Sequence, residues 1–141
     1  MGIKILQTRD SLSVAMIRLL VGVVFLSEGI QKFIYPELRG AGRFESIGFE
    51  EPELLGLFVG SLEVSSALLL LFGLYSRLAA IATLLIMVMA IATTKFPIWA
   101  HEGFWEMMHA SRTDLAMLVC SIYLIRNGSG KWSIDRLLLR Q

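Results

Sequence analysis

Seven ionisable side chains interrupt stretches of sequence that are otherwise strongly apolar. They are Arg18, Glu28, Lys32, Glu63, His109, Arg112 and Asp114. A charged side chain in hydrocarbon is costly unless it is paired or faces a polar cavity, so such residues often mark a path for a ligand or for protons. A quinone-like ligand needs hydrogen-bond donors at its carbonyl oxygens and a nearby carboxylate that relays protons. Arginine or lysine together with Glu63 and Asp114 would supply both, which makes the seven residues candidate ligand-binding residues.

The same side chains also have a structural interpretation. All of them except His109 can form buried ion pairs that fix how neighbouring helices align. Such pairs are weak evidence for stability, but they are costly to break. The pattern of residues does not separate the two interpretations, and no catalytic residue is assigned.

A second group of polar residues precedes the last apolar stretch of the chain. It consists of His101, Glu102, Glu106 and His109. Glu102, Glu106 and His109 can share one face of a helix, which His101 would cap. The spacing is not the HExxH pattern of zinc enzymes. We therefore expect solvated or interfacial side chains here, and no metal site is assigned.

The composition places the chain in a membrane. Its 141 residues carry a formal net charge of +1 and one cysteine, and their mean hydropathy is +0.66. A soluble domain would be much more polar. The near-zero net charge argues against a nucleic-acid partner, and the lone Cys120 cannot form a disulfide within the chain. We expect a multi-pass protein of the cell (inner) membrane, in contact with the lipid bilayer.

Apolar stretches of membrane-spanning length indicate the helices that position these side chains. They lie at about residues 12–35, 53–73, 76–94 and 105–125. About 20 apolar residues cross a bilayer core of roughly 30 Å, and the fourth stretch reaches this length only if it includes its polar first half. The segment 95–105, rich in tryptophan, is typical of an interfacial loop. We predict an all-α membrane protein, a four-transmembrane-helix bundle formed by a single domain over residues 1–141.

Helical periodicity sorts the charged residues onto inner faces. At about 100° per residue, one narrow arc of the first helix holds the following residues, with Glu28 at its edge: Arg18, Gly22, Phe25, Gly29 and Lys32. On the second helix, Glu63 shares a face with Gly56 and Gly60, whose spacing permits close helix approach. Each of these helices therefore has a charged inner face and an apolar face for lipid.

Basic residues are distributed unequally between the two ends of the expected helices. One end carries Lys4, Arg9, Arg77, Arg126, Lys131, Arg136 and Arg140. The other end carries fewer basic residues and most of the acidic ones. Because cytoplasmic loops are enriched in lysine and arginine, both termini are expected to be cytoplasmic.

In this orientation most of the candidate residues lie in the outer half to the middle of the membrane, where we expect them to line one pocket. Lys32 follows Glu28 by four positions, a favourable order for a pair along one helix. Arg18 lies nearer the cytoplasm, about 15 Å from Glu28 along the helix axis. Because no acidic residue shares its depth, its partner is a backbone carbonyl, a lipid phosphate or a ligand.

Several segments of the sequence resemble the DoxX family. The spacing Arg18-x-x-x-Gly22-x-x-Phe25-x-x-x-Gly29-x-x-Lys32 resembles the first helix of that family. Glu63 is also similar, as are the runs Leu71-Phe72-Gly73-Leu74-Tyr75-Ser76-Arg77 and Gly128-Ser129-Gly130-Lys131-Trp132-Ser133-Ile134-Asp135. The resemblance implies a four-helix inner-membrane protein. One relative, DoxD, is a subunit of an archaeal thiosulfate:quinone oxidoreductase, and other members are linked to membrane responses to oxidative and thiol stress.

Two classes of function are consistent with these residues. In the first, the protein is a subunit of a membrane redox system with a quinone-like ligand in a pocket formed by buried charges. In the second, it binds or transports a small solute, or supports assembly, without catalysis of its own. The sequence has no motif for haem, flavin or iron–sulfur clusters, so electron transfer would need a bound quinone or a redox partner protein. Whether the chain is itself an enzyme is left open, and a second copy is an alternative partner.

Overall fold

The computed structural model describes residues 9–139, and these residues form helices and connecting turns without any strand. The long helices are α2 (Leu12–Ile34), α5 (Pro52–Phe72), α6 (Ser76–Ala90) and α8 (Phe104–Asn127). The short elements are α3 (Pro36–Arg39), α4 (Ala41–Ile47), the π-helix η1 (Ile91–Lys95), α7 (Phe96–Glu102) and α9 (Ile134–Leu138). The predicted all-α class is confirmed. Lys4 and Arg140, which contributed to the predicted orientation, lie outside the described residues.

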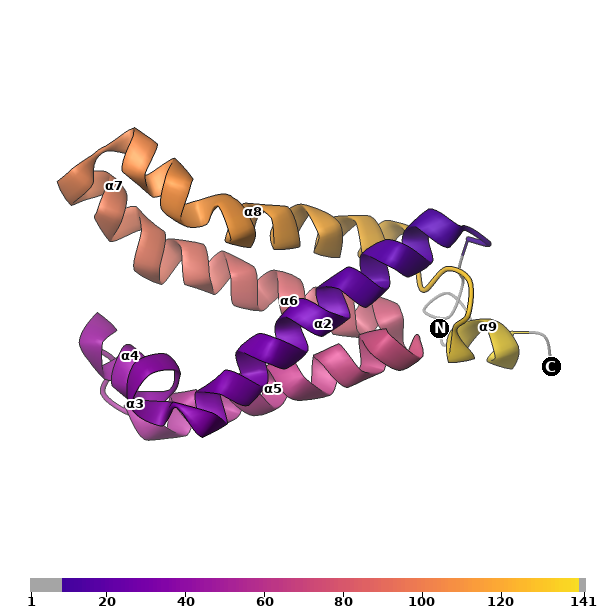
Figure 1. The fold of residues 1–141 in the computed structure, drawn as a ribbon, viewed down its shortest axis with the longest axis horizontal. Helices are drawn as coiled ribbons and strands as arrows, with labels where there is room; N and C mark the ends of the chain where they lie inside the picture. The colour runs from indigo at the N-terminus through magenta and orange to yellow at the C-terminus, as the bar shows by residue number, and fades with distance from the viewer. Residues whose placement is uncertain (1–8, 140–141) are drawn as a thin grey trace.

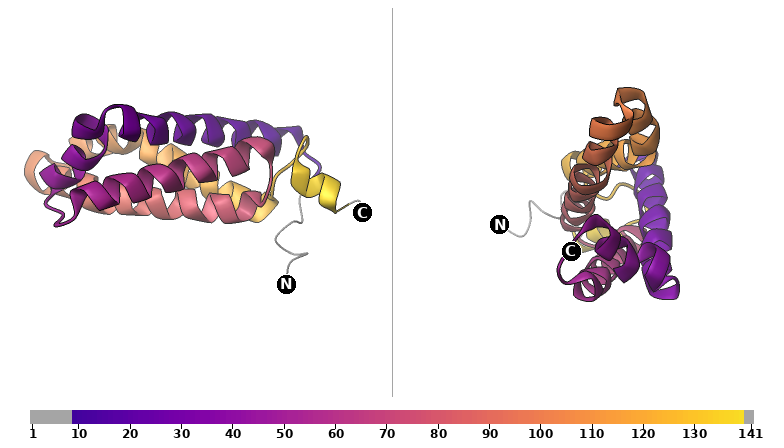
Figure 2. Two further views of the ribbon diagram at one scale, coloured as in Figure 1. Left: turned by 90° about the horizontal axis from the view of Figure 1, so that it is seen from below. Right: turned by 90° about the vertical axis from the view of Figure 1, so that its left-hand side faces the viewer.

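The long helices pack as two pairs. Helix α2 packs along α5, and α6 packs along α8. Figure 1 shows both ends of the chain at one end of the bundle, and α3, α4 and α7 at the other. Figure 2 shows that the four long helices run along the same axis of an elongated bundle. The two pairs also contact each other, through α5 with α6 and through α2 with α8.

Large apolar side chains cover the outside of this bundle. Met16, Phe58, Leu85 and Val119, one from each long helix, are all more than half exposed. Among the described residues, three helices are long and apolar enough to cross a membrane: Leu12–Ile34, Pro52–Phe72 and the continuous helix Ser76–Glu102. Helix α8, with 24 residues, is also long enough to cross a membrane, but its polar first half makes it less apolar than these three helices. An exposed apolar surface of this extent fits a lipid environment.

Glycines let α2 and α5 approach closely. A Cβ atom on Gly29 would lie 3.0 Å from the Cβ atom of Glu63, and a Cβ atom on Gly60 would lie 3.1 Å from the ring of Phe33. The two glycines of the second helix have different neighbours, since Gly60 faces α2 whereas Gly56 faces the backbone of Ala41 in α4. The close contact brings the charged faces of α2 and α5 together, as small residues do in membrane helix pairs.

The loop expected over residues 95–105 is wrong. Helix α6 continues through the π turn η1 into α7, so that the chain is helical from Ser76 to Glu102. This segment contains Pro97, and proline has no N–H and disrupts a helix interior. In the structure Pro97 occupies the first turn of α7, directly after the π turn, where a missing N–H is tolerated. Gly103 then separates α7 from α8.

Candidate functional site

Arg18 is buried at the end of the bundle that carries both termini, with 1 % of its surface exposed. Its Nη1 atom donates to the carbonyl oxygens of Leu70 and Leu71 at the end of α5. Its Nη2 atom donates to the carbonyl oxygen of Trp132, at 3.0 Å, and more weakly to that of Lys131, at 3.4 Å. Of the three partners considered for Arg18, the structure therefore gives it backbone carbonyls. The positive charge also lies at the negative end of the α5 dipole.

Asp135, which was not among the candidate residues, completes this arrangement. It is 1 % exposed. Its Oδ1 atom accepts from the N–H of Tyr75 at 2.7 Å, and its Oδ2 atom accepts from the N–H of Ser76 at 3.1 Å. Tyr75 is the N-cap residue of α6 and makes no side-chain cap bond, so a distant carboxylate binds the free N–H groups at the start of this helix. We call Arg18, Gly73, Ser76, Ser133 and Asp135 the terminal polar cluster.

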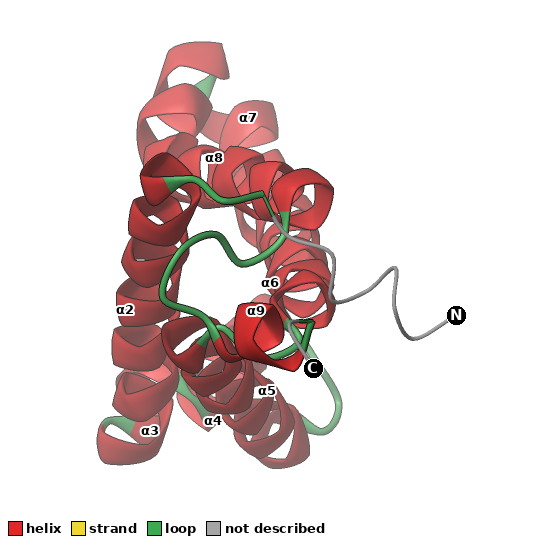
Figure 3. Ribbon diagram, turned by 90° about the vertical axis from the view of Figure 1, so that its right-hand side faces the viewer, coloured by secondary structure: helices red, strands yellow, loops and turns green. Residues whose placement is uncertain are grey.

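Figure 3 looks at this end of the molecule and shows the segment after α8 crossing it to reach α9. The backbone N–H of Asp135 donates to the carbonyl oxygen of Gly73 at 2.9 Å, and that of Lys131 donates to the carbonyl oxygen of Ser11 at 3.2 Å. The C-terminal segment is thus bonded to the start of α2 and to the α5–α6 turn. The terminal polar cluster holds backbone in place, since its charged groups bind main-chain atoms.

Lys32 and Glu63 form an ion pair toward the opposite end of α2. The Nζ and Oε2 atoms are 2.6 Å apart, and the two side chains are 11 % and 3 % exposed. The close approach at Gly29 and Gly60 brings these side chains together across the α2–α5 contact. Glu28, the local partner expected for Lys32, is exposed. Lys32 therefore bonds across helices rather than along its own.

The remaining candidates belong to the other helix pair. Asp114 on α8 pairs with Lys95 of η1, with 3.3 Å between Oδ2 and Nζ. Arg112 donates to Nε2 of His109 at 2.7 Å and to the carbonyl oxygen of the same residue at 2.9 Å. Both of these side chains are exposed. Within the described part of the chain, the seven candidates thus form separate groups, and the direct contacts between two of them are Lys32–Glu63 and Arg112–His109.

A pocket of about 240 Å³ lies beside the Lys32–Glu63 pair. It is lined by Lys32, Phe33, Pro36, Ala41, Glu53, Gly56 and Leu57. Of the seven candidates, Lys32 alone lines it, and the same residue is bonded to Glu63. This volume is below the roughly 300–1,000 Å³ that encloses a drug-sized ligand.

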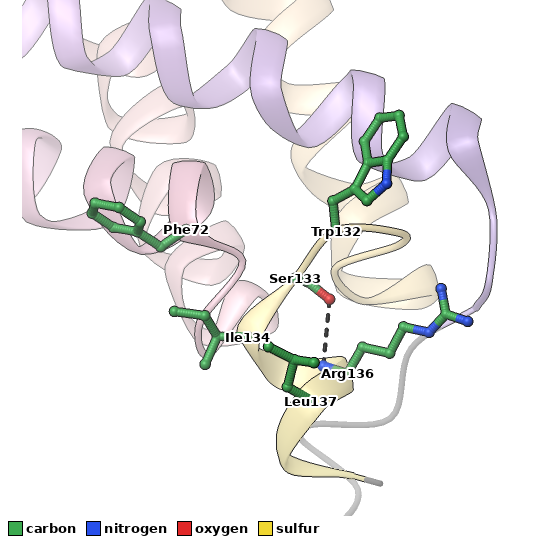
Figure 4. A pocket seen from close by; sticks show the side chains of 6 residues that line it. All are labelled: Phe72, Trp132, Ser133, Ile134, Arg136 and Leu137. Carbon is green, nitrogen blue, oxygen red and sulfur yellow. Dashed lines mark hydrogen bonds between the residues drawn. The ribbon is translucent and has the colours of Figure 1, made fainter.

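A second pocket, of about 340 Å³, lies at the end with the termini (Figure 4). It is lined by Phe72, Trp132, Ser133, Ile134, Arg136 and Leu137. None of the seven candidates lines it. Among residues 9–139, no three His, Cys, Asp or Glu side chains come together as a metal site would require, and His101, Glu102 and Glu106 are exposed.

Comparison with known proteins places the chain in a family. The sequence model of the DoxX family matches residues 13–98. The uncharacterized membrane protein Rv3486 of Mycobacterium tuberculosis (strain ATCC 25618 / H37Rv) is 46 % identical over 144 residues, which cover 98 % of this chain and 88 % of that protein. The chain belongs to the DoxX family. No solved structure matches it.

Membership of the DoxX family, together with the apolar helices, makes this chain a multi-pass membrane protein. The segments that carried the DoxX resemblance meet in space. Arg18, the Leu71–Arg77 run and the Gly128–Asp135 run join in the terminal polar cluster. The DoxX model itself ends at residue 98, before the segment that supplies Asp135. Much of the resemblance therefore lies in residues that hold the backbone together.

Proposed function

We propose that this DoxX-family protein crosses the membrane four times, with both termini in the cytoplasm. Helix α8 has 24 residues and packs along α6, and Asp114 in its polar half is paired with Lys95. Exposed aromatic residues, which favour the two membrane–water interfaces, lie toward both ends of the bundle. Trp99 and Trp105 lie toward one end, and Tyr75 and Trp132 lie toward the other. The excess of basic residues at the end with the termini supports the orientation.

Reporter fusions test this topology. Fusions at Gly48 and at Trp99 are expected to report the outside of the membrane, and a fusion at Gln141 is expected to report the cytoplasm. The physical reason is the retention of lysine- and arginine-rich segments on the cytoplasmic side. A C-terminal fusion that reports the outside would contradict the proposed topology, through either the orientation or the number of spans.

We further propose that the protein is a membrane subunit of a redox system and binds a quinone-like head group in the pocket beside Lys32. The observation that carries this proposal is the position of Lys32, which lines the pocket and bonds to buried Glu63 behind it. The ammonium group has three donors and no acceptor, so it can bond to Glu63 and to a ligand carbonyl at the same time. After Lys32 transfers a proton to the ligand, Glu63 would take up a proton from water and pass it to Lys32.

Complete reduction of a quinone needs two electrons and two protons. The lysine–carboxylate pair offers a route for protons. The sequence, however, has no motif for a redox cofactor that would supply the electrons. The electrons must then come from a redox partner protein in the same membrane. We therefore propose an accessory role in a quinone-linked oxidoreductase, in which this chain positions the quinone.

The measurement is mass spectrometry of lipophilic molecules that co-purify with the protein from native membranes. We expect about one quinone per chain. Lys32→Met should reduce quinone retention about tenfold or more, because a hydrogen bond from a charged donor contributes about 1.5–3 kcal/mol. A wild-type protein without quinone, or equal retention in Lys32→Met, would contradict the proposal.

Two further variants separate binding from folding. Lys32→Met leaves Glu63 buried without its partner, which costs roughly 3–5 kcal/mol of stability. Lys32→Met/Glu63→Met removes both charges and should recover the wild-type melting temperature while still failing to retain quinone. Lys95→Met breaks the ion pair of the other helix pair and is the matched control, which should keep the quinone.

The second candidate function is a module that binds a small solute or supports assembly without catalysis. It is favoured by one observation, namely that the charges of Lys32 and Glu63 neutralise each other. The same mass spectrometry distinguishes the two functions. A stoichiometric solute other than a quinone would favour the second.

A further inference from the structure

Trp132 adopts a backbone conformation that its side chain disfavours. Its φ is +52°, in the left-handed region where a bulky residue is an outlier. The side chain is nevertheless 73 % exposed, so contacts within the protein do not account for a tryptophan at this position. A glycine would adopt the same conformation without strain. The indole is therefore available for contacts outside the chain.

The surroundings of Trp132 are apolar on one side and basic on the other. Phe72 and Leu137 line the same pocket and are each 62 % exposed. Figure 4 shows Phe72 and Ile134 on one side of this pocket, with the Arg136 side chain extending away from them. A site with exposed apolar walls and a guanidinium group at its edge is amphipathic. In a membrane protein this combination fits the level where acyl chains meet head groups.

The charge at this end of the molecule has the sign that an anionic lipid needs. Arg136 forms two bonds of 2.7 Å to the carboxylate of Asp10, which leaves further guanidinium donors for another anion. Lys131 and Arg126 add positive charge near the same end of the bundle, whereas Asp135 is buried against backbone N–H groups. Positive charges next to a bilayer attract anionic phospholipids.

We propose that this pocket binds one anionic phospholipid of the surrounding bilayer. The acyl region packs against Phe72, Ile134 and Leu137, the Trp132 indole lies at the level of the glycerol backbone, and the phosphate is bound by Arg136. The site is distinct from the pocket at Lys32 and does not depend on the function proposed for it. One lipid molecule is thus a specific ligand of the C-terminal segment, in addition to the bulk lipid that surrounds the protein.

Quenching of Trp132 fluorescence by brominated lipids tests this proposal. The full chain with Trp99→Phe and Trp105→Phe keeps Trp132 as its single tryptophan. It is reconstituted into phosphatidylcholine vesicles that contain equal fractions of either brominated phosphatidylcholine or brominated phosphatidylglycerol. We expect phosphatidylglycerol to be preferred at Trp132, and we expect Arg136→Gln to reduce that preference about fivefold. Equal quenching by the two lipids would overturn the proposal.

Matched variants distinguish a lipid site from a structural ion pair, from general surface charge and from a site for a soluble anion. Asp10→Asn breaks the same ion pair but keeps the Arg136 charge, so the preference should persist; a loss equal to that of Arg136→Gln would overturn the proposal in favour of a structural ion pair. Arg126→Gln removes one charge outside the pocket and should keep most of the preference. An equal loss there would overturn the proposal in favour of general surface charge.

Inorganic phosphate should not displace the lipid. Displacement by phosphate would overturn the proposal in favour of a site for a soluble anion.

Discussion

Arg18→Met is expected to lower the free energy of unfolding by several kcal/mol and to detach the C-terminal segment from the bundle. The guanidinium group binds carbonyl oxygens from α5 and from the segment before α9. Leaving a buried acceptor without its donor costs about 1–3 kcal/mol, and Arg18 has several such partners. The measurement is thermal unfolding in detergent, combined with limited proteolysis of the segment after α8.

Arg18→Lys sharpens this prediction. Lysine keeps the charge, but its single ammonium group cannot reproduce the planar fork that reaches α5 and the tail together. We expect a loss of stability smaller than that of Arg18→Met but still measurable. Arg126→Met, an exposed position at the same end, is the control and should melt like the wild type. A wild-type melting temperature in Arg18→Met would contradict the structural role of the cluster.

Gly73→Ala is expected to disrupt the same end of the bundle by a different mechanism. Gly73 has a φ of +67°, and a Cβ atom on it would lie 2.5 Å from the Cβ atom of Ser133 and 2.9 Å from Nη1 of Arg18. The left-handed conformation alone costs alanine roughly 1–2 kcal/mol. The clash adds to this because the Ser133 backbone must also move away. We expect a large fall in melting temperature and faster proteolysis of the tail.

Gly48→Ala is the matched control for this substitution. Gly48 also has a positive φ, +94°, but nothing lies within 4 Å of a Cβ atom placed there. The difference between the two variants therefore measures the clash without the conformational penalty. Equal destabilisation by the two substitutions would show that packing of the tail against Gly73 contributes little.

The fold class was predictable from the sequence because it depends on the length of apolar stretches, which is a local property. The membrane location followed from the same stretches and is confirmed by the DoxX membership and by the apolar helices. Local rules failed where a π turn allowed the chain to stay helical through Pro97. Such a turn has no simple signature in residue types.

The partners of the charged residues were harder to predict because they are set by helix contacts. Sequence spacing favoured Glu28 for Lys32, whereas the close approach at Gly29 and Gly60 supplies Glu63 instead. Asp135 was missed because it caps a helix that begins 59 residues earlier in the chain. The signal was present in the Gly128–Asp135 run, but a sequence does not show which backbone N–H groups a distant carboxylate will bind. That the seven candidates form a ligand site stays a prediction.

The cap that Asp135 places on α6 has a consequence for the order of assembly during synthesis. Asp135 follows all four long helices in the sequence, so the ribosome makes it after they have been translated. Until then the N–H groups of Tyr75 and Ser76 lack their carboxylate, and Arg18 lacks its bonds to the segment before α9. The helices can enter the bilayer in chain order, but this end of the bundle closes only after the segment that carries Asp135 has been made.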